Sequence, residues 1–308
     1  MSKKWLISVL GPTASGKTGL AILLAKHFGA DIFSADSRQF YQELNIGVAR
    51  PGADELEAVR HHYIGHISIH DDYSAGDFEK EAQTNLDTYF RQNNVGLLVG
   101  GSGLFVKAVL EGLDHFPLVD QQIREKLNKV YEEEGLEPLL NQLAELDADT
   151  LEHIDTKNHR RVIRALEVCL QTGMPFSSFK SQRQKSRPFT TVKLAIDWPR
   201  EELYNRINTR VDEMLKAGLV EEARSVFPFR SLNSLNTVGY SELFDMFEGK
   251  CSMAEAIDKI KQHTRNYAKR QLTWLRKDHD IHWINPSIKL NEITSILAAK
   301  GVDADLNE

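Results

Sequence analysis

The sequence predicts an α/β fold in which helices flank a mostly parallel sheet, with a helical insertion between two parts of that sheet. Short apolar runs typical of buried strands alternate with helical patterns, beginning with LISVL at 6–10. From about 114 to 190 no core strand is evident, and three helical patterns follow one another. We therefore expect a core of residues 1–113 and 191–308 and an inserted helical domain of 114–190.

The first apolar run leads directly into GPTASGKT at 11–18, which matches G-x-x-x-x-G-K-[ST] at every fixed position. A helical apolar stripe follows, so the motif has the strand–loop–helix context of a P-loop. The loop backbone and the helix N-terminus both attract phosphate oxygens, while Lys17 adds a cation and Thr18 a hydroxyl for Mg²⁺. The motif predicts a P-loop NTPase-like core that binds a diphosphate or triphosphate through Gly11, Thr13, Ala14, Ser15, Gly16, Lys17 and Thr18.

Two other strand ends are expected beside this loop. The run 30–35 ends at Asp36, and the run 95–99 ends in Gly-Gly-Ser102. Open α/β sheets bind ligands at such strand ends, so Asp36 is a candidate base, with capping of the next turn as the alternative. Many P-loop hydrolases have a Mg²⁺-supporting Asp where this chain has Ser102. That difference argues against a motor-type NTPase, although Asp197 after a later strand is an alternative carboxylate.

Composition narrows the class of protein. The 308 residues carry a net charge of −6, so a nucleic-acid surface must be a local patch. No apolar run approaches 18 residues, and the N-terminal run is assigned to the first strand, so we expect neither a membrane span nor a signal peptide. Cys169 and Cys251 lie far apart, which predicts neither a disulfide framework nor a zinc site. We expect a cytoplasmic protein.

Three basic segments could form such a patch. The basic residues of the helical pattern 158–171, with Lys157 just before it, share one face, and a polyanionic partner would relieve their mutual repulsion. The alternative is that acidic neighbours such as Asp155 and Glu167 pair with them. A second segment, 180–187, resembles an exposed loop, and a third lies on a helix at 260–277 with interleaved aromatics. That pattern suits RNA, although the aromatics could equally be core. The basic residues are Lys157, Arg160, Arg161, Arg164, then Lys180, Arg183, Lys185, Arg187, then Lys261, Arg265, Lys269, Arg276. The adjacent His61 and His62 are expected to be structural or substrate-lining.

The chain resembles bacterial tRNA dimethylallyltransferases in a series of motifs that covers nearly its whole length. The glycine-rich loop alone is generic, whereas the DSRQ segment and the TRNYAKRQLTWLR helix are specific to that family. The motifs are GPTASGKT at 11–18, SADSRQFY at 34–41, VGGSGLF at 99–105, NHRRVIRALEV at 158–168, MLKAGLVEEA at 214–223, VGYSE at 238–242 and KQHTRNYAKRQLTWLR at 261–276.

The resemblance implies transfer of a dimethylallyl group from its diphosphate to N6 of the adenine at tRNA position 37, without ATP hydrolysis. Lys17 and Mg²⁺ at Thr18 would stabilise the leaving diphosphate, and Asp36 would take the N6 proton beside Ser102. The adenine would leave the anticodon-loop stack to reach the donor. Partners would be dimethylallyl diphosphate and a tRNA anticodon stem-loop, bound by a monomer. The implied tRNA contacts, extended by position to the basic helices, are Asp36, Ser37, Arg38, Gln39, Ser102, Arg124, Arg160, Arg161, Arg164, Arg265, Lys269 and Arg276.

The sequence departs from the family pattern at two positions. Phe105 stands where the family has Tyr, and Asn236 stands where relatives often have a basic residue that contacts pyrophosphate.

Three other functions remain open. An ATP-dependent small-molecule kinase would share the P-loop and Asp36 but leave the basic helices unexplained. A prenyltransferase acting on free adenine nucleotide would leave them unexplained too. An RNA-binding module without catalysis would not need Asp36.

Overall fold

The computed structural model describes residues 3–180 and 185–302. The chain divides into two compact units, one of Met1–Glu111 with Arg187–Glu308 and the other of Gly112–Ser186. The second unit lies close to the expected insertion of 114–190 but ends earlier. The reason is that Phe189 is buried in the core of the first unit.

Arg187 corrects the prediction of an exposed basic loop at 180–187. Its Nη2 donates to the Ala108 carbonyl at 2.7 Å and lies 3.0 Å from Glu79 Oε1, and both charged side chains are about 10% exposed. This pair therefore belongs to the interior of the first unit and is not available to a partner. Arg183 of the same segment, like the polar tail 303–308, lies outside the described residues.

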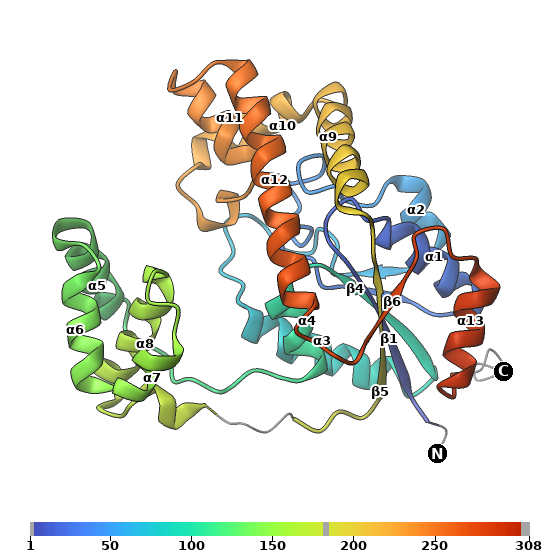
Figure 1. The fold of residues 1–308 in the computed structure, drawn as a ribbon, viewed down its shortest axis with the longest axis horizontal. Coiled ribbons are helices and arrows are strands. Elements are labelled where there is room, and N and C mark those ends of the chain that lie inside the picture. Colours follow the sequence, from blue (N-terminus) through green and yellow to red (C-terminus); the bar gives the residue numbers. More distant parts are fainter. Residues whose placement is uncertain (1–2, 181–184, 303–308) are drawn as a thin grey trace. The chain divides into compact units, whose positions relative to one another are not determined.

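The first unit is built on a six-stranded sheet in the order β3-β2-β4-β1-β5-β6, with all of these strand pairs parallel (Figure 1). This confirms the predicted fold class. Leu10 pairs with Gly100 and Ser34 pairs with Val99, so three chain segments leave the sheet at the same edge. The strands are β1 (Trp5–Leu10), β2 (Ile32–Ser34), β3 (His61–His62), β4 (Val95–Gly100), β5 (Thr190–Ile196) and β6 (Ile281–Ile284).

Successive side chains of a strand point to opposite faces of the sheet, and both faces are buried. In β1, Trp5, Ile7 and Val9 pack with helices α1 and α13, while Leu6 and Leu10 pack with α3 and α4. Apolar side chains on both faces are what a parallel sheet covered by helices requires. The flanking helices are α1 (Lys17–Phe28), α2 (Ala53–Ala58), α3 (Ala75–Tyr89), α4 (Gly103–Leu110) and α13 (Leu290–Ala299).

Four further helices of the first unit form a separate cluster that carries part of the site. They are α9 (Arg200–Lys216), α10 (Leu219–Val226), α11 (Tyr240–Phe247) and α12 (Met253–Leu275), with short 3-10 turns at Phe227–Phe229 and Asn233–Leu235. Gly218, with a φ of 103°, separates α9 from α10. α12 begins seven residues before the predicted 260. No helix of the described residues combines the length and apolar character needed to cross a membrane.

Glu222 of α10 anchors the loop that precedes α2. Its Oε2 accepts from the Asn45 and Ile46 amides at 3.1 and 2.8 Å. Its Oε1 accepts from the Gly47 amide at 2.8 Å and from the Tyr240 hydroxyl at 2.5 Å. A Cβ on Gly47 would lie 2.6 Å from the Tyr240 ring, so the loop and ring are in direct contact. One carboxylate therefore pairs four donors and sets the position of this loop.

The second unit is a small helical domain with its own core. Leu127, Leu143 and Val162 come from three different helices and are buried together. Its elements are α5 (Gln121–Glu134), α6 (Glu137–Leu146), α7 (Ala148–His153), α8 (His159–Thr172) and a 3-10 turn at Phe176–Phe179. α7 is an addition to the three predicted helices. Lys157 precedes α8, so it does not share that helix face with the three arginines, contrary to prediction.

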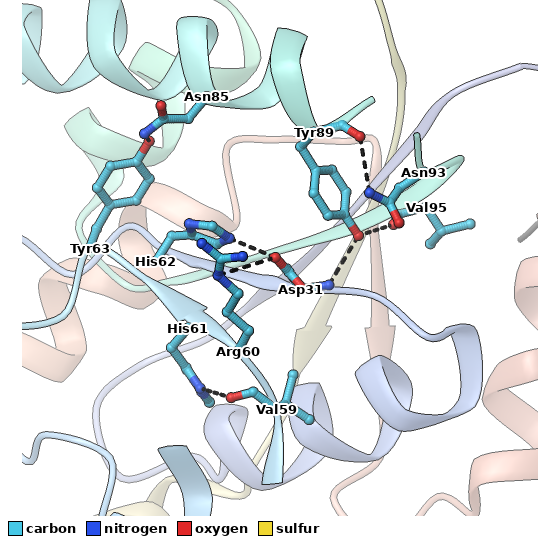
Figure 2. Close-up of polar contacts among 10 residues, drawn as sticks. All are labelled: Asp31, Val59, Arg60, His61, His62, Tyr63, Asn85, Tyr89, Asn93 and Val95. Carbon is cyan, nitrogen blue, oxygen red and sulfur yellow. Dashed lines mark hydrogen bonds and ion pairs between the residues drawn. The ribbon is translucent and has the colours of Figure 1, made fainter. Parts of the chain in front are cut away.

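The adjacent histidines are structural, and Figure 2 shows that they point to different partners. His62 Nε2 lies 2.7 Å from Asp31 Oδ2, and its ring stacks on Phe33 with centroids 4.4 Å apart. His61 Nδ1 lies 2.8 Å from the Val59 carbonyl. These contacts hold the short edge strand β3, and neither histidine lines the cavity described below.

We predict that Glu222→Ala lowers the free energy of unfolding by about 3 kcal/mol, because two part-buried amides and the hydroxyl of the buried Tyr240 would lose their acceptor. Urea unfolding of the full chain followed by circular dichroism measures this loss. Glu221→Ala is the matched control, since Glu221 is the exposed neighbour on the same helix. Equal losses for the two variants would contradict the anchoring role.

Candidate active site

A cavity of about 1190 Å³ opens in the first unit where β1, β2 and β4 end. Residues of the P-loop, the segment after β2, the turn after β4 and helices α9 and α12 line it. Part of its wall is charged, and part is apolar, including Val48, Leu104, Phe105, Val211 and Met214. The cavity can therefore hold an anion and an apolar group side by side.

The P-loop joins β1 to α1 in the conformation that an anion site needs. Ala14 and Gly16 have φ values of 64° and 91°, and a Cβ on Gly11 would lie 2.7 Å from Ser15 Oγ. No side chain caps the N-terminus of α1, which leaves its first amides for a ligand. Ser15 Oγ is buried without a hydrogen-bond partner in the described residues. An oxyanion bound in this loop would satisfy these donors.

Lys17 places a cation with a lowered pKa beside the loop. Its Nζ donates to the Pro12 carbonyl at 2.7 Å. Burial is the main cause that lowers the pKa of Lys17 to about 8; the Asp36 carboxylate opposes this shift, and nearby Arg210 adds to it. A bound diphosphate would restore the preference for the ammonium form.

Asp36 follows β2 and lines the same cavity. Burial raises the pKa of its carboxyl above the usual range, while the Arg38 amide, Lys17, Arg38 and Arg210 act against that rise. The Arg38 amide donates to Asp36 Oδ1 at 3.1 Å, which is a local turn contact of the kind that the capping alternative describes. The second carboxylate oxygen remains for a substrate, so Asp36 is both a local cap and a candidate base.

Ser102, at the end of β4, is joined to the Asp36 segment and neighbours α12. Its Oγ lies 3.3 Å from both the amide and the hydroxyl of Ser37. Burial raises the pKa of the Tyr267 phenol of α12 to about 12, and the neighbouring Ser102 hydroxyl acts against that rise. The serine that replaces the Mg²⁺-supporting carboxylate of other P-loop proteins is thus part of a hydroxyl network beside Asp36.

Gln271 of α12, which the sequence interpretation overlooked, connects two walls of the cavity. Its Oε1 accepts from the Thr13 amide and its Nε2 donates to the Gly101 carbonyl, both at 2.9 Å. The side chain is buried between Ala268 and Leu275 on the core-facing side of the helix. An uncharged polar residue at a core position was the available signal, because such residues are rarely buried without a specific partner.

Arg206 and Arg210 of α9 are further site residues that the sequence interpretation missed. Arg206 Nε donates to the Ala14 carbonyl at 2.8 Å, and its guanidinium lies 4.4 Å from the Trp198 ring centroid. Arg210 Nη1 lies 3.4 Å from Thr13 Oγ1, and burial lowers its pKa. Their spacing of four residues beside a core stripe was the signal, but only the fold places that helix against the P-loop.

The predicted tRNA contacts after Asp36 are already engaged within the protein. Arg38 donates to the carbonyls of Ser234 and Asn236 at 2.9 and 3.1 Å. Gln39 donates to the Ala49 carbonyl at 2.9 Å and is 9% exposed. These two side chains therefore shape the cavity wall, whatever else they contact.

The basic residues of the second unit divide into paired and exposed groups. Arg124 and Arg164 both bind the buried Glu167 carboxylate, at 3.0 and 3.1 Å for their closest Nη contacts. These pairs lower the pKa of Glu167 against the effect of burial. Arg160 and Arg161 are exposed on α8. Neutralisation by Glu167, the alternative raised from the sequence, thus applies to Arg164 but not to Arg160 or Arg161.

The basic row of α12 faces away from the cavity. Arg265 donates to Asn208 Oδ1 at 2.7 Å, so it packs against α9. Lys269 is exposed, and Arg276 lies 4.0 Å from Asp197. None of these three side chains lines the cavity, whereas Tyr267 and Trp274 do.

The surroundings of Thr18 suit a magnesium ion that is held mainly by the phosphate oxygens of a bound substrate. Thr18 lines the cavity beside Lys17, and the described residues contain no cluster of three carboxylate, histidine or cysteine ligands. Asp197 does not line the cavity, and its carboxylate lies 4.0 Å from Arg276. A Mg²⁺ ion commonly uses few protein oxygens together with phosphate oxygens and water, which these residues permit.

Comparison with known sequences matches most of the chain to one family. The IPP transferase family model matches residues 39–278. A tRNA dimethylallyltransferase of Christiangramia forsetii is 52% identical over 279 residues, covering 91% of this chain and 92% of that protein. Another, of Cytophaga hutchinsonii, is 47% identical and covers 96% of this chain and 97% of that one.

Solved structures agree with the sequence comparison. A tRNA isopentenylpyrophosphate transferase of Bacillus halodurans superposes with a TM-score of 0.72 at 33% identity, covering 97% of both chains. A eukaryotic dimethylallyltransferase acting on tRNA has the same fold, with a TM-score of 0.77 at 24% identity over 97% of this chain and 78% of that one. The motif resemblance and the comparisons thus lead to the same family.

We predict that the affinity for an alkyl diphosphate falls as the pH rises above about 8, because the free Lys17 ammonium then loses its proton. The loss should reach at most about tenfold per pH unit, as expected for one linked proton. Calorimetric titration between pH 6.5 and 9.5 measures it. In Lys17→Arg the guanidinium stays protonated, so the decline should disappear.

Lys26→Arg is the control for that titration, since Lys26 is exposed at the far end of the same helix. It should keep the wild-type pH dependence. A wild-type affinity that is constant from pH 7 to 9.5 would remove Lys17 as the titrating group.

Proposed function

This chain belongs to the IPP transferase family, and we propose that it transfers a dimethylallyl group from dimethylallyl diphosphate to N6 of the adenine at tRNA position 37, releasing diphosphate. One observation supports this above the others: the P-loop, the Asp36 carboxylate and an apolar wall share one cavity. A prenyl diphosphate requires the P-loop and the apolar wall, and an amine nucleophile requires a base, which is the Asp36 carboxylate. We propose that the reaction takes place in the cytoplasm.

The donor's diphosphate is assigned to the P-loop. The first amides of α1, the Lys17 ammonium and the Arg210 guanidinium surround this position. Negative charge develops on the diphosphate as the allylic carbon–oxygen bond breaks, so these groups stabilise the transition state more than the bound donor. Mg²⁺, held by the Thr18 hydroxyl and diphosphate oxygens, would add Lewis-acid stabilisation of the leaving group.

Asp36 is assigned as the base for the adenine amine. The N6 lone pair forms the new bond to C1 of the donor, and the C1–O electron pair leaves with the diphosphate. The extra proton on N6 passes to the Asp36 carboxylate. Burial raises the pKa of Asp36, which makes the carboxylate a stronger acceptor than an exposed one. We assign to Ser102 a hydrogen bond to the donor or to the adenine bound beside it.

Two walls of the cavity suit the remaining parts of the substrates. Leu104, Phe105 and Met214 offer an apolar surface for the five-carbon chain. Tyr267 and Trp274 offer rings where an extruded adenine can stack, as bases do when enzymes remove them from a helix. The aromatics of α12 therefore serve the site more directly than its basic row.

The tRNA backbone is assigned to exposed cations outside the cavity. Arg160, Arg161 and Lys269 are the strongest candidates because they are exposed. Arg124, Arg164, Arg265 and Arg276 already contact other side chains, so we assign them a secondary part. Residues 36–39 would meet the adenine at the cavity. We propose that one chain acts alone, since the P-loop, the Asp36 carboxylate and the apolar wall that the reaction needs are supplied together in one cavity of a single chain.

The test is a transfer assay with purified protein, Mg²⁺, labelled dimethylallyl diphosphate and either unmodified tRNA or AMP, with ATP consumption measured separately. Label should enter tRNA alone. Asp36→Asn should lower turnover by about 10² to 10⁴, the range for a lost general base, with donor affinity largely kept. In the wild type, turnover should fall as the pH drops through the raised pKa of Asp36, because protonation removes the base.

Asp87→Asn, an exposed carboxylate on α3 outside the cavity, serves as the control and should leave turnover unchanged. Label in AMP would redirect the acceptor assignment. ATP consumed without prenyl transfer would favour a kinase and refute the proposal. Normal turnover in Asp36→Asn would remove Asp36 as the base.

We predict that Arg161→Ala weakens tRNA binding and reduces the slope of log affinity against log salt by about 1, because one phosphate contact is lost. Filter binding at several salt concentrations measures the slope. Lys129→Ala removes a cation from α5 of the same unit that already pairs with Glu133 at 3.8 Å, and it should change the slope less. A slope unaltered in Arg161→Ala would make this face structural.

A further inference from the structure

The outer side of the P-loop is held by two side chains from later parts of the chain. Trp198, which follows β5, donates from Nε1 to the Ser15 carbonyl at 2.9 Å. Arg206 of α9 donates from Nε to the Ala14 carbonyl at 2.8 Å, and its guanidinium lies 4.4 Å from the centroid of the Trp198 ring. Two successive peptide groups of the loop are therefore fixed from outside by a pair of side chains that contact each other.

These contacts decide which way the loop amides point. In a planar trans peptide the carbonyl and the N–H point in opposite directions. The Ala14 carbonyl shares its peptide group with the Ser15 amide, and the Ser15 carbonyl shares its peptide group with the Gly16 amide. The Ser15 amide donates to the Pro12 carbonyl at 3.3 Å, and Lys17 Nζ donates to the same carbonyl at 2.7 Å. The Ser15 amide and the Lys17 cation therefore face one side of the loop, opposite the outer contacts.

The loop needs such support because part of its backbone has an uncommon conformation. Ala14 has a φ of 64°, in the left-handed region that residues with a side chain rarely adopt. Its side chain is buried in one cluster with Leu203 and Ile207 of α9. Rotation of the two peptide groups out of this arrangement would turn the Ser15 and Gly16 amides away from a bound anion.

We propose that Trp198 and Arg206 are positioning residues for the diphosphate of the donor. By holding the Ser15 carbonyl, Trp198 keeps the Gly16 amide directed at a diphosphate oxygen. By holding the Ala14 carbonyl, Arg206 does the same for the Ser15 amide. Neither side chain lines the cavity, so both act through the backbone of the loop. The inference rests on the proposed function, which assigns the diphosphate to this loop.

The test is Trp198→Phe, which keeps an aromatic ring beside Arg206 and removes the Nε1 donor. Calorimetric titration of the full chain with inorganic diphosphate and Mg²⁺ measures the Kd. We expect the Kd to rise about tenfold, the scale of one oriented hydrogen bond to a charged group. Trp283→Phe is the matched control, since Trp283 is also half-buried, lies on the neighbouring strand β6 and does not line the cavity. It should keep the wild-type Kd.

The Gly16 amide gives a readout that a loss of packing alone would not change. In the wild type, diphosphate should shift the nuclear magnetic resonance signal of this amide proton, because the amide then donates to an oxyanion. In Trp198→Phe at saturating diphosphate the shift should be smaller. The shift of the Thr18 amide should be retained, because α1 fixes the direction of that amide.

Arg206→Met is the second variant, because Arg206 is exposed and its replacement leaves the core intact. The Kd for diphosphate should rise by a smaller factor than in Trp198→Phe, since water competes for an exposed hydrogen bond. Arg200→Met is the matched control: Arg200 is also exposed on α9, and its guanidinium lies 5.2 Å from the Tyr204 ring centroid. This control removes the same charge without a P-loop contact, and it should keep the wild-type Kd.

Three results would overturn the inference. A wild-type Kd in Trp198→Phe is one, and an undiminished shift of the Gly16 amide in that variant is another. The third is an equal rise in Arg200→Met and Arg206→Met, which would show that only the charge of Arg206 matters. Failure of the proposed function is distinguishable, because the wild-type protein would then bind diphosphate but transfer no label to tRNA.

Discussion

The buried amide of Gln271 is the contact on which the geometry of the site depends. It joins the Thr13 amide of the P-loop to the Gly101 carbonyl of the turn after β4, and it comes from a helix near the end of the chain. Three segments that are far apart in sequence thereby share one side chain. Backbone groups buried without partners are costly, so displacing this helix would also disturb the anion loop and the neighbourhood of Ser102.

Desolvation gives the site its chemistry. Burial disfavours the charged forms of Lys17, Asp36 and Arg210. Attraction between the Asp36 carboxylate and the two cations partly offsets this effect for all three groups. Together these three groups carry two positive charges and one negative charge. In the proposed reaction, a bound diphosphate would favour the charged forms of Lys17 and Arg210. The same low-polarity surroundings that perturb these groups also strengthen their interactions with a developing charge.

The basic residues of the protein divide into those that are paired within the fold and those that are left exposed. Arg38, Arg164 and Arg187 bind carbonyls or carboxylates of the chain itself, whereas Arg160 and Arg161 are exposed. In an acidic protein, counting basic residues is therefore a poor guide to an RNA surface. What matters is which cations lack an internal acidic partner, and helix spacing alone does not determine that.

The sequence by itself determined the parallel α/β core, the P-loop with Lys17 and Thr18, and the strand ends at Asp36 and Ser102, because each depends on local pattern and backbone geometry. It also predicted the family. Only the tertiary structure decided that Arg206, Arg210, Gln271 and Tyr267 belong to the site, since these residues come from helices whose packing on the loops is a long-range property. It likewise paired Arg187 with Glu79 and Arg164 with Glu167, because a charged side chain finds its partner only once the fold brings the two together.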